Sequence, residues 1–113
     1  MIEDVSFGKL VFRGKVYRSD CIIHGDSINS RWWRKEGDKI LYEDLEDLVK
    51  LKPDTIVIGK GFMNYINILE DTIEKLSNMN IEVIVRQTDK AVEVYNVLIE
   101  RKDKNIVGVF HLV

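Results

Sequence analysis

The segment "TIVIGKGFMNYI", from Thr55 to Ile66, decides the fold because it contains both a buried strand and the turn that ends it. Its first five residues, "TIVIG", run without polar alternation, which is typical of a strand covered on both faces of its sheet. Gly59 and Gly61 then allow a tight turn, since glycine adopts a positive φ without steric cost. The segment therefore predicts a central strand of an α/β sheet.

Helical and strand patterns alternate from this segment to the end of the chain. Apolar residues at helical spacing predict a helix from Leu41 that Pro53 stops, one from Asp71 to Asn78, and a third from an N-cap at Thr88 to Ile99. The strands "IEVIV" and "IVGVF" follow the second and third helices. We expect these two strands and "TIVIG" to lie side by side as the buried centre of one largely parallel sheet.

The chain before Ile40 has a different texture. The segment "VSFGKLVFRGKVYRSDCIIHG" contains short β-prone runs divided by glycines, which predicts an N-terminal β-hairpin region of two or three strands. With 113 residues, of which 45% are hydrophobic, the chain suits one α/β domain over residues 1–113.

Composition narrows the classes of function. A formal net charge of −2 gives no overall basic field, so nucleic acid is not an expected partner. The start "MIEDVSFG" has acids where a signal peptide is basic, and no apolar run is long enough for a membrane span. The single cysteine, Cys21, fits a reducing compartment. We expect a cytoplasmic protein without a membrane partner, a cofactor or a metal site.

The glycines at the end of the central strand raise the question of nucleotide binding. A dinucleotide fingerprint needs a third glycine, where this chain has Asn64, and a helix that begins inside the motif. The acidic helix-start signals come only at Glu70 and Asp71. A Walker A loop is not matched either, because Lys60 lies between the glycines and no Ser or Thr follows it. The pattern favours a structural turn, with a small pocket beside it as the alternative.

Six short segments together resemble a known family. They are "FG" at Phe7 and Gly8, "YRSD" from Tyr17, "WWRKEG" from Trp32, "IVIGKG" from Ile56, "TDKAVEVYN" from Thr88 and "GVFHL" from Gly108. In this order they are similar to the adipogenesis-associated Mth-type domain family, which also includes a mitochondrial complex I assembly factor. The resemblance implies a three-layer α/β fold with a central mixed sheet and no established enzymatic activity, with roles in assembly or regulation in the eukaryotic members.

This chain departs from the family pattern at two points. Asp38 stands where family members often carry a histidine after "EG", and no Thr-Cys pair follows Leu112. A function that depends on those groups is therefore not carried over.

The segment "RWWRKEGDK" leads to the first hypothesis of function. On an alternating strand, one of Trp32 and Trp33 would face the core and the other would face outward. The tryptophans would also suit stacking on bases and the basic residues around them would suit neutralising phosphates, but the acidic chain favours protein contact. We therefore predict a non-catalytic protein-binding or assembly module that uses a partner protein or self-association. Its predicted interaction surface is Arg31, Trp32, Trp33 and Arg34.

The second hypothesis is a small-molecule or anion-binding pocket, or a hydrolytic one, at the carboxyl ends of the central strands. Its candidate residues are Asp20, Gly59, Lys60, Gly61, Thr88 and Asn96. The two hypotheses differ in one expectation: a pocket requires that these polar side chains converge on a cavity. No nucleophile, base and orienting group occur together at an interpretable spacing, so no catalytic residue is assigned.

A thiol or metal site at Cys21, His24 and His111 is disfavoured. Positions three apart on a strand face opposite sides of the sheet, so Cys21 and His24 would converge only if the chain turned between them. Cys21 is therefore interpreted as a packed structural cysteine.

Overall fold

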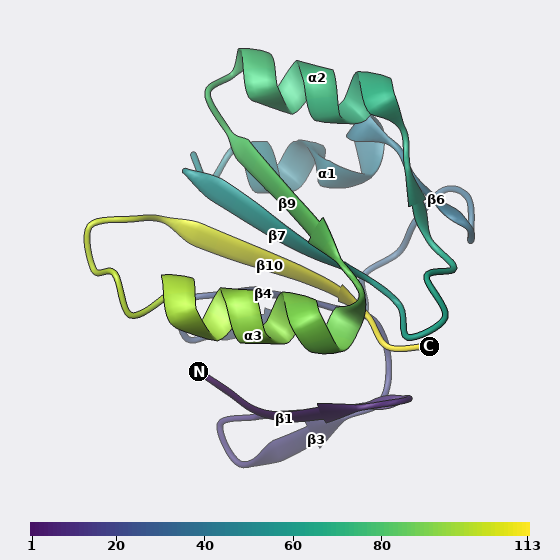
Figure 1. Cartoon of the computed structure of the whole chain (residues 1–113), viewed down its shortest axis with the longest axis vertical. Coiled ribbons are helices and arrows are strands. Elements are labelled where there is room, and N and C mark those ends of the chain that lie inside the picture. Colours follow the sequence, from purple (N-terminus) through teal and green to yellow (C-terminus); the bar gives the residue numbers. More distant parts are fainter.

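A computed structural model describes residues 1–113 and shows three layers built around a mixed sheet (Figure 1). This sheet has five strands. The strand order is β5-β4-β10-β7-β9. The strands β10, β7 and β9 are parallel, whereas β4 and β5 run antiparallel to their neighbours. Their bounds are β4 Cys21–His24, β5 Ser27–Asn29, β7 Thr55–Lys60, β9 Glu82–Arg86 and β10 Ile106–His111.

Each face of this sheet has its own apolar cluster. Ile56 and Ile58 of β7 pack with residues of α1 (Tyr42–Val49) and α2 (Glu70–Asn78). Val57, which points the other way, packs with α3 (Thr88–Leu98). The N-terminal strands β1 (Ile2–Ser6), β2 (Lys9–Phe12) and β3 (Lys15–Tyr17) form an antiparallel sheet that joins the α3 layer.

The remaining two strands and the helices complete the chain. The strands β6 (Lys39–Ile40) and β8 (Asn67–Ile68) form a short parallel pair. The helices are 8, 9 and 11 residues long, and none has the length and apolar character to span a bilayer.

Two expectations about these elements are wrong. The three apolar strands do lie side by side, but β9 is at the edge of the sheet and its three central residues are only partly buried. A hydrophobic run predicts a strand but contains no information about which strands flank it. Thr88 is the first helical residue rather than the N-cap, which is Gln87.

Candidate functional site

The turn after β7 packs the sheet against α3. Gly61 has φ +96°, its N–H donates to Thr88 Oγ1 at 2.8 Å, and its carbonyl accepts from the Thr88 N–H at 3.2 Å. Gly59 is needed for a different reason, because a Cβ there would lie 2.9 Å from Thr88 Oγ1 and 3.1 Å from Thr88 Cα. The Gly61 amide, which a phosphate would need at this turn, is therefore already bonded to the helix.

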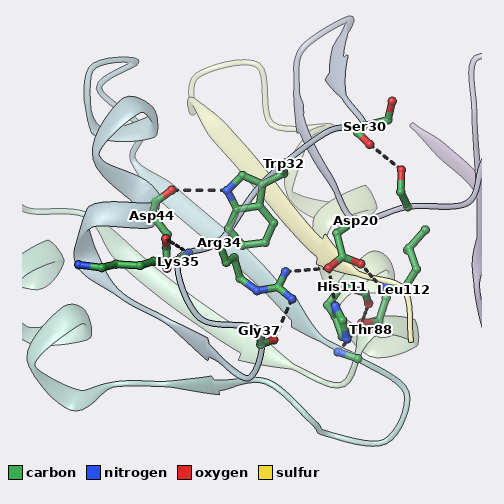
Figure 2. A network of polar contacts seen from close by, with 12 residues as sticks. Asp20, Ser30, Trp32, Arg34, Lys35, Gly37, Asp44, Thr88, His111 and Leu112 are labelled. Atoms are coloured by element: carbon green, nitrogen blue, oxygen red, sulfur yellow. Dashed lines mark hydrogen bonds and ion pairs between the residues drawn. The ribbon is translucent and has the colours of Figure 1, made fainter.

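A cluster of polar side chains lies at the carboxyl end of β10 (Figure 2). One oxygen of Asp20, Oδ2, accepts from Arg34 Nη1 at 2.7 Å and from His111 Nδ1 at 2.5 Å. The other oxygen, Oδ1, accepts from the Leu112 N–H at 3.0 Å. The fold brings these residues together because the start of β4 pairs with the end of β10, through Cys21 and Phe110.

The surroundings of Asp20 keep it ionised. Burial by itself would raise the pKa of this carboxyl, but hydrogen bonds from His111, Arg34 and the Leu112 amide outweigh it and lower the pKa to about 2. Since an ionised carboxylate only accepts hydrogen bonds, Nδ1 of His111 carries the proton. Asp20 therefore selects the tautomer of His111 and pairs with Arg34 at neutral pH.

Arg34 connects this cluster to the tryptophan loop, which we define as Ser30–Asp38. Its side chain is only 9% exposed, and Nη2 donates to the Gly37 carbonyl at 3.0 Å. Its Nε has no hydrogen-bond partner, and its guanidinium carbon lies 5.0 Å from the centre of the Trp32 ring. Cation–π contact with that ring accompanies the ion pair to Asp20.

The tryptophan loop has no regular secondary structure, so the expected alternating strand is wrong. Side chains hold the loop instead, as Figure 2 shows. Ser19 Oγ donates to the Ser30 carbonyl at 2.5 Å, and Asp44 accepts from the Lys35 N–H at 3.0 Å. Trp32 is half-buried and donates from Nε1 to the Asp44 carbonyl at 3.4 Å, whereas Trp33 is 75% exposed. One tryptophan is thus packed and the other open to solvent, for a reason other than strand alternation.

A groove of about 680 Å³ lies beside this loop, between the β4–β5 hairpin and α1. Trp32 and Trp33 line it together with Ile28 of β5. Leu48 and Leu51 supply apolar surface from α1 and the turn after it. The groove is thus bounded by the half-buried and the exposed tryptophan and has an apolar lining on both sides.

The predicted pocket residues do not converge on this groove, and none of their polar side chains lines it. Asn96 lies far from the carboxyl edge, where its side chain bonds the Ile2 amide at 2.8 Å and carbonyl at 2.9 Å and so fixes β1 to α3. Thr88 is buried beneath the glycine turn. Asp20 and Lys60 remain at the carboxyl edge of the sheet.

Of the predicted interaction surface, three residues line the groove and one does not. Arg31, Trp32 and Trp33 do, while Arg34 is turned inward to Asp20.

The structure also separates the cysteine from the histidines. Cys21 is buried in the α3-facing cluster, and burial together with the Asp20 charge raises the pKa of its thiol to about 12. His24 instead lies against Asn105 Oδ1, with its Nε2 at 2.7 Å. The sequence suggests His111 only as a metal ligand and does not reveal its bond to Asp20. The one feature of the sequence that could indicate this bond is that Asp20 directly precedes the strand β4 and His111 ends the last strand, β10.

Comparison with known proteins identifies the family. A family model described as "Protein of unknown function (DUF498/DUF598)" matches residues 2–111. The chain belongs to this family. Its structural neighbours include a Bordetella pertussis protein described as an Mth938-like domain, so the resemblance to Mth-type domains is confirmed.

Three solved structures show how widely the fold of this DUF498/DUF598 domain is shared. The conserved hypothetical protein PH1505 of Pyrococcus horikoshii has a TM-score of 0.86 at 23% identity, with 100% of this chain and 98% of that chain covered. The protein MT938 gives 0.80 at 25% identity, covering 100% and 97%. The Bordetella pertussis protein gives 0.76 at 13% identity, covering 99% and 85%. These likenesses establish the three-layer mixed α/β fold.

Proposed function

We propose that this DUF498/DUF598 domain is a non-catalytic protein-binding module whose contact surface is Trp33 and the adjoining groove. One observation carries the proposal: Trp33 is 75% exposed on a loop that side-chain hydrogen bonds and an ion pair hold in place. Tryptophan is among the residues most enriched where interfaces concentrate their binding energy. A loop that is already ordered loses little conformational entropy on binding.

The composition of the groove supports a protein as the ligand. Its lining combines apolar side chains with charges of both signs, from Arg31 and Lys35 on the loop and Glu43 and Asp47 on α1. Protein interfaces likewise combine apolar and polar surface. The resemblance to a family that includes an assembly factor points in the same direction. The partner is either a second copy of this chain or another protein.

The test compares two exposed apolar side chains on different elements. Trp33→Ala should weaken association by about 2 kcal/mol, or roughly thirtyfold in affinity. Val97→Ala is the matched control, because Val97 is 62% exposed on α3. Sedimentation across a concentration series measures self-association. Affinity isolation from the native host, with each variant as bait, identifies and ranks a partner of different sequence.

Two results would contradict the proposal. One is that Trp33→Ala associates as strongly as the wild type both with itself and with every isolated partner. The other is that Val97→Ala weakens association as much as Trp33→Ala, since the contact would then not be specific to the tryptophan loop.

A further inference from the structure

The carboxyl edge of the sheet places a lysine beside the histidine that Asp20 holds. His111 ends β10 and Lys60 ends β7, and the parallel register pairs these two residues directly. Side chains paired in this way lie on the same face of a sheet, with the strands about 4.8 Å apart. Lys60 takes part in none of the ion pairs of the chain. Its ammonium group is therefore a charge without a protein counter-ion.

His111 is held on several sides and open at one atom. Asp20 binds Nδ1, and the Tyr65 ring stacks on the imidazole with centroids 6.2 Å apart and planes 25° apart. Gly61 closes one edge, since a Cβ there would be 2.8 Å from His111 Cδ2. The hydrogen bond of His111 to Asp20 uses Nδ1, and Nε2 has no hydrogen-bond partner in the chain. Arg34 Nε is the one side-chain nitrogen that lacks a partner and is also enclosed, so Nε2 of His111 reaches solvent.

The sign of the local charge decides what can bind there. Asp20 and Arg34 neutralise each other in their ion pair, which leaves the ammonium group of Lys60 as the local charge beside the imidazole of His111. The neighbouring lysine would repel a metal cation, and the site offers it only one imidazole nitrogen. An oxyanion is attracted by Lys60. Because Nδ1 of His111 carries the proton that Asp20 accepts, Nε2 donates a hydrogen bond to the oxyanion when both ring nitrogens are protonated.

We propose that Lys60 and Nε2 of His111 form a binding site for a small oxyanion group, either a phosphate or a carboxylate. It is separate from the groove beside Trp33, which neither residue lines. The proposal assigns a binding role to His111 and a positioning role to Asp20, which orients the imidazole through Nδ1.

The experiment uses NMR spectra of the histidine side-chain nitrogens in the full-length protein. Inorganic phosphate and acetate are titrated separately at constant ionic strength, with chloride as the balancing salt. A saturable shift of His111 Nε2 with either probe is the expected result. Saturation by phosphate alone identifies a phosphate ligand, and saturation by both identifies a site that also accepts carboxylates.

Variants of Lys60 make the test specific without disturbing the Asp20 cluster. Lys60→Gln should weaken the affinity for the probe at least about fivefold, and Lys60→Arg should retain it, since loss of one charge contact is worth on the order of 1 kcal/mol. Lys75→Gln on α2 is the control and should bind as the wild type does.

Three outcomes would overturn the proposal. His111 Nε2 fails to shift with both probes, or Lys60→Gln binds as well as the wild type. The third is that His24, which lines a pocket with Arg101, Lys102 and Lys104, shifts instead of His111, which would place the anion at a different surface. None of these outcomes depends on whether Trp33 binds a protein.

Discussion

The tryptophan loop and the Gly61–Ile66 loop differ in how the fold holds them. The Gly61–Ile66 loop is bonded mainly through its backbone, with the Phe62 N–H donating to the Val113 carbonyl at 3.1 Å and the Ile66 N–H to the Lys60 carbonyl at 3.1 Å. The tryptophan loop depends on the side chains of Asp20, Arg34 and Asp44. Backbone bonds are available to almost any sequence, whereas a loop held by side chains requires particular residues. The difference indicates that Asp20, Arg34 and Asp44 maintain the orientation of the tryptophan loop.

The two loops meet at one carboxylate. Arg34 comes from the tryptophan loop, and His111 stacks with Tyr65 of the Gly61–Ile66 loop, yet both donate to Oδ2 of Asp20. We expect substitutions to lower the free energy of unfolding most in the shared sheet. The effect should be smaller in one loop, smaller again at the shared carboxylate, and smallest at an exposed side chain.

The largest effect is expected from Val57→Asp, which removes the support of both loops. Val57 is fully buried in the central strand, and an unpaired charge there costs several kcal/mol of a total stability of about 5 to 15 kcal/mol. We expect the variant to be unfolded by circular dichroism. Val97→Asp, at an exposed helix position, should melt like the wild type. A cooperative, wild-type-like melt of Val57→Asp would contradict the assigned core.

The next effect separates conformational strain from close packing at glycine. Gly61 and Gly25 both have positive φ, at +96° and +59°, but only Gly61 lies against other atoms. Gly25→Ala should cost about 1 kcal/mol of unfolding free energy through strain alone, whereas Gly61→Ala should cost about 2 to 4 kcal/mol. Chemical denaturation measures both values. Equal costs would show that the approach of His111 to Gly61 is not tight.

A third prediction concerns the shared carboxylate and pH. The pKa of Asp20 is about 2 in the folded protein, below its ordinary value of 3.8, so its stabilisation is complete above about pH 4 and is lost as the pH falls through 2. The lost stabilisation is at most about 2 kcal/mol, because solvent screens a partly exposed group. Asp20→Asn should flatten this part of the stability curve. Asp103→Asn, at an exposed loop position, should leave it unchanged.

The sequence predicts the positions of the helices and strands better than it predicts which strands lie side by side. The helices at Tyr42–Val49, Glu70–Asn78 and Thr88–Leu98 follow from local periodicity and begin within one residue of the expected positions. Strand order is a property of the whole chain, which is why local patterns do not reveal the edge position of β9.

The candidate site is less predictable for the same reason. Asp20 and His111 are 91 residues apart in sequence, and only the antiparallel pairing of β4 with β10 brings them together. The residues of the tryptophan loop by themselves predict a strand. The side chains that hold the segment as a loop, Ser19, Asp20 and Asp44, lie outside it and cannot be recognised from its own residues.

The smallest effect on stability is expected at Trp33, and it is the sharpest test of the comparison between the loops. Trp33→Ala should change the unfolding free energy by less than about 0.5 kcal/mol, since the side chain is 75% exposed. Trp32→Ala should cost about 2 kcal/mol, because it removes the contact with Arg34 and the bond to the Asp44 carbonyl. Urea denaturation of both variants gives the difference. If Trp33→Ala were as costly as Trp32→Ala, Trp33 would belong to the fold, and its exposure would no longer indicate a surface kept for a partner.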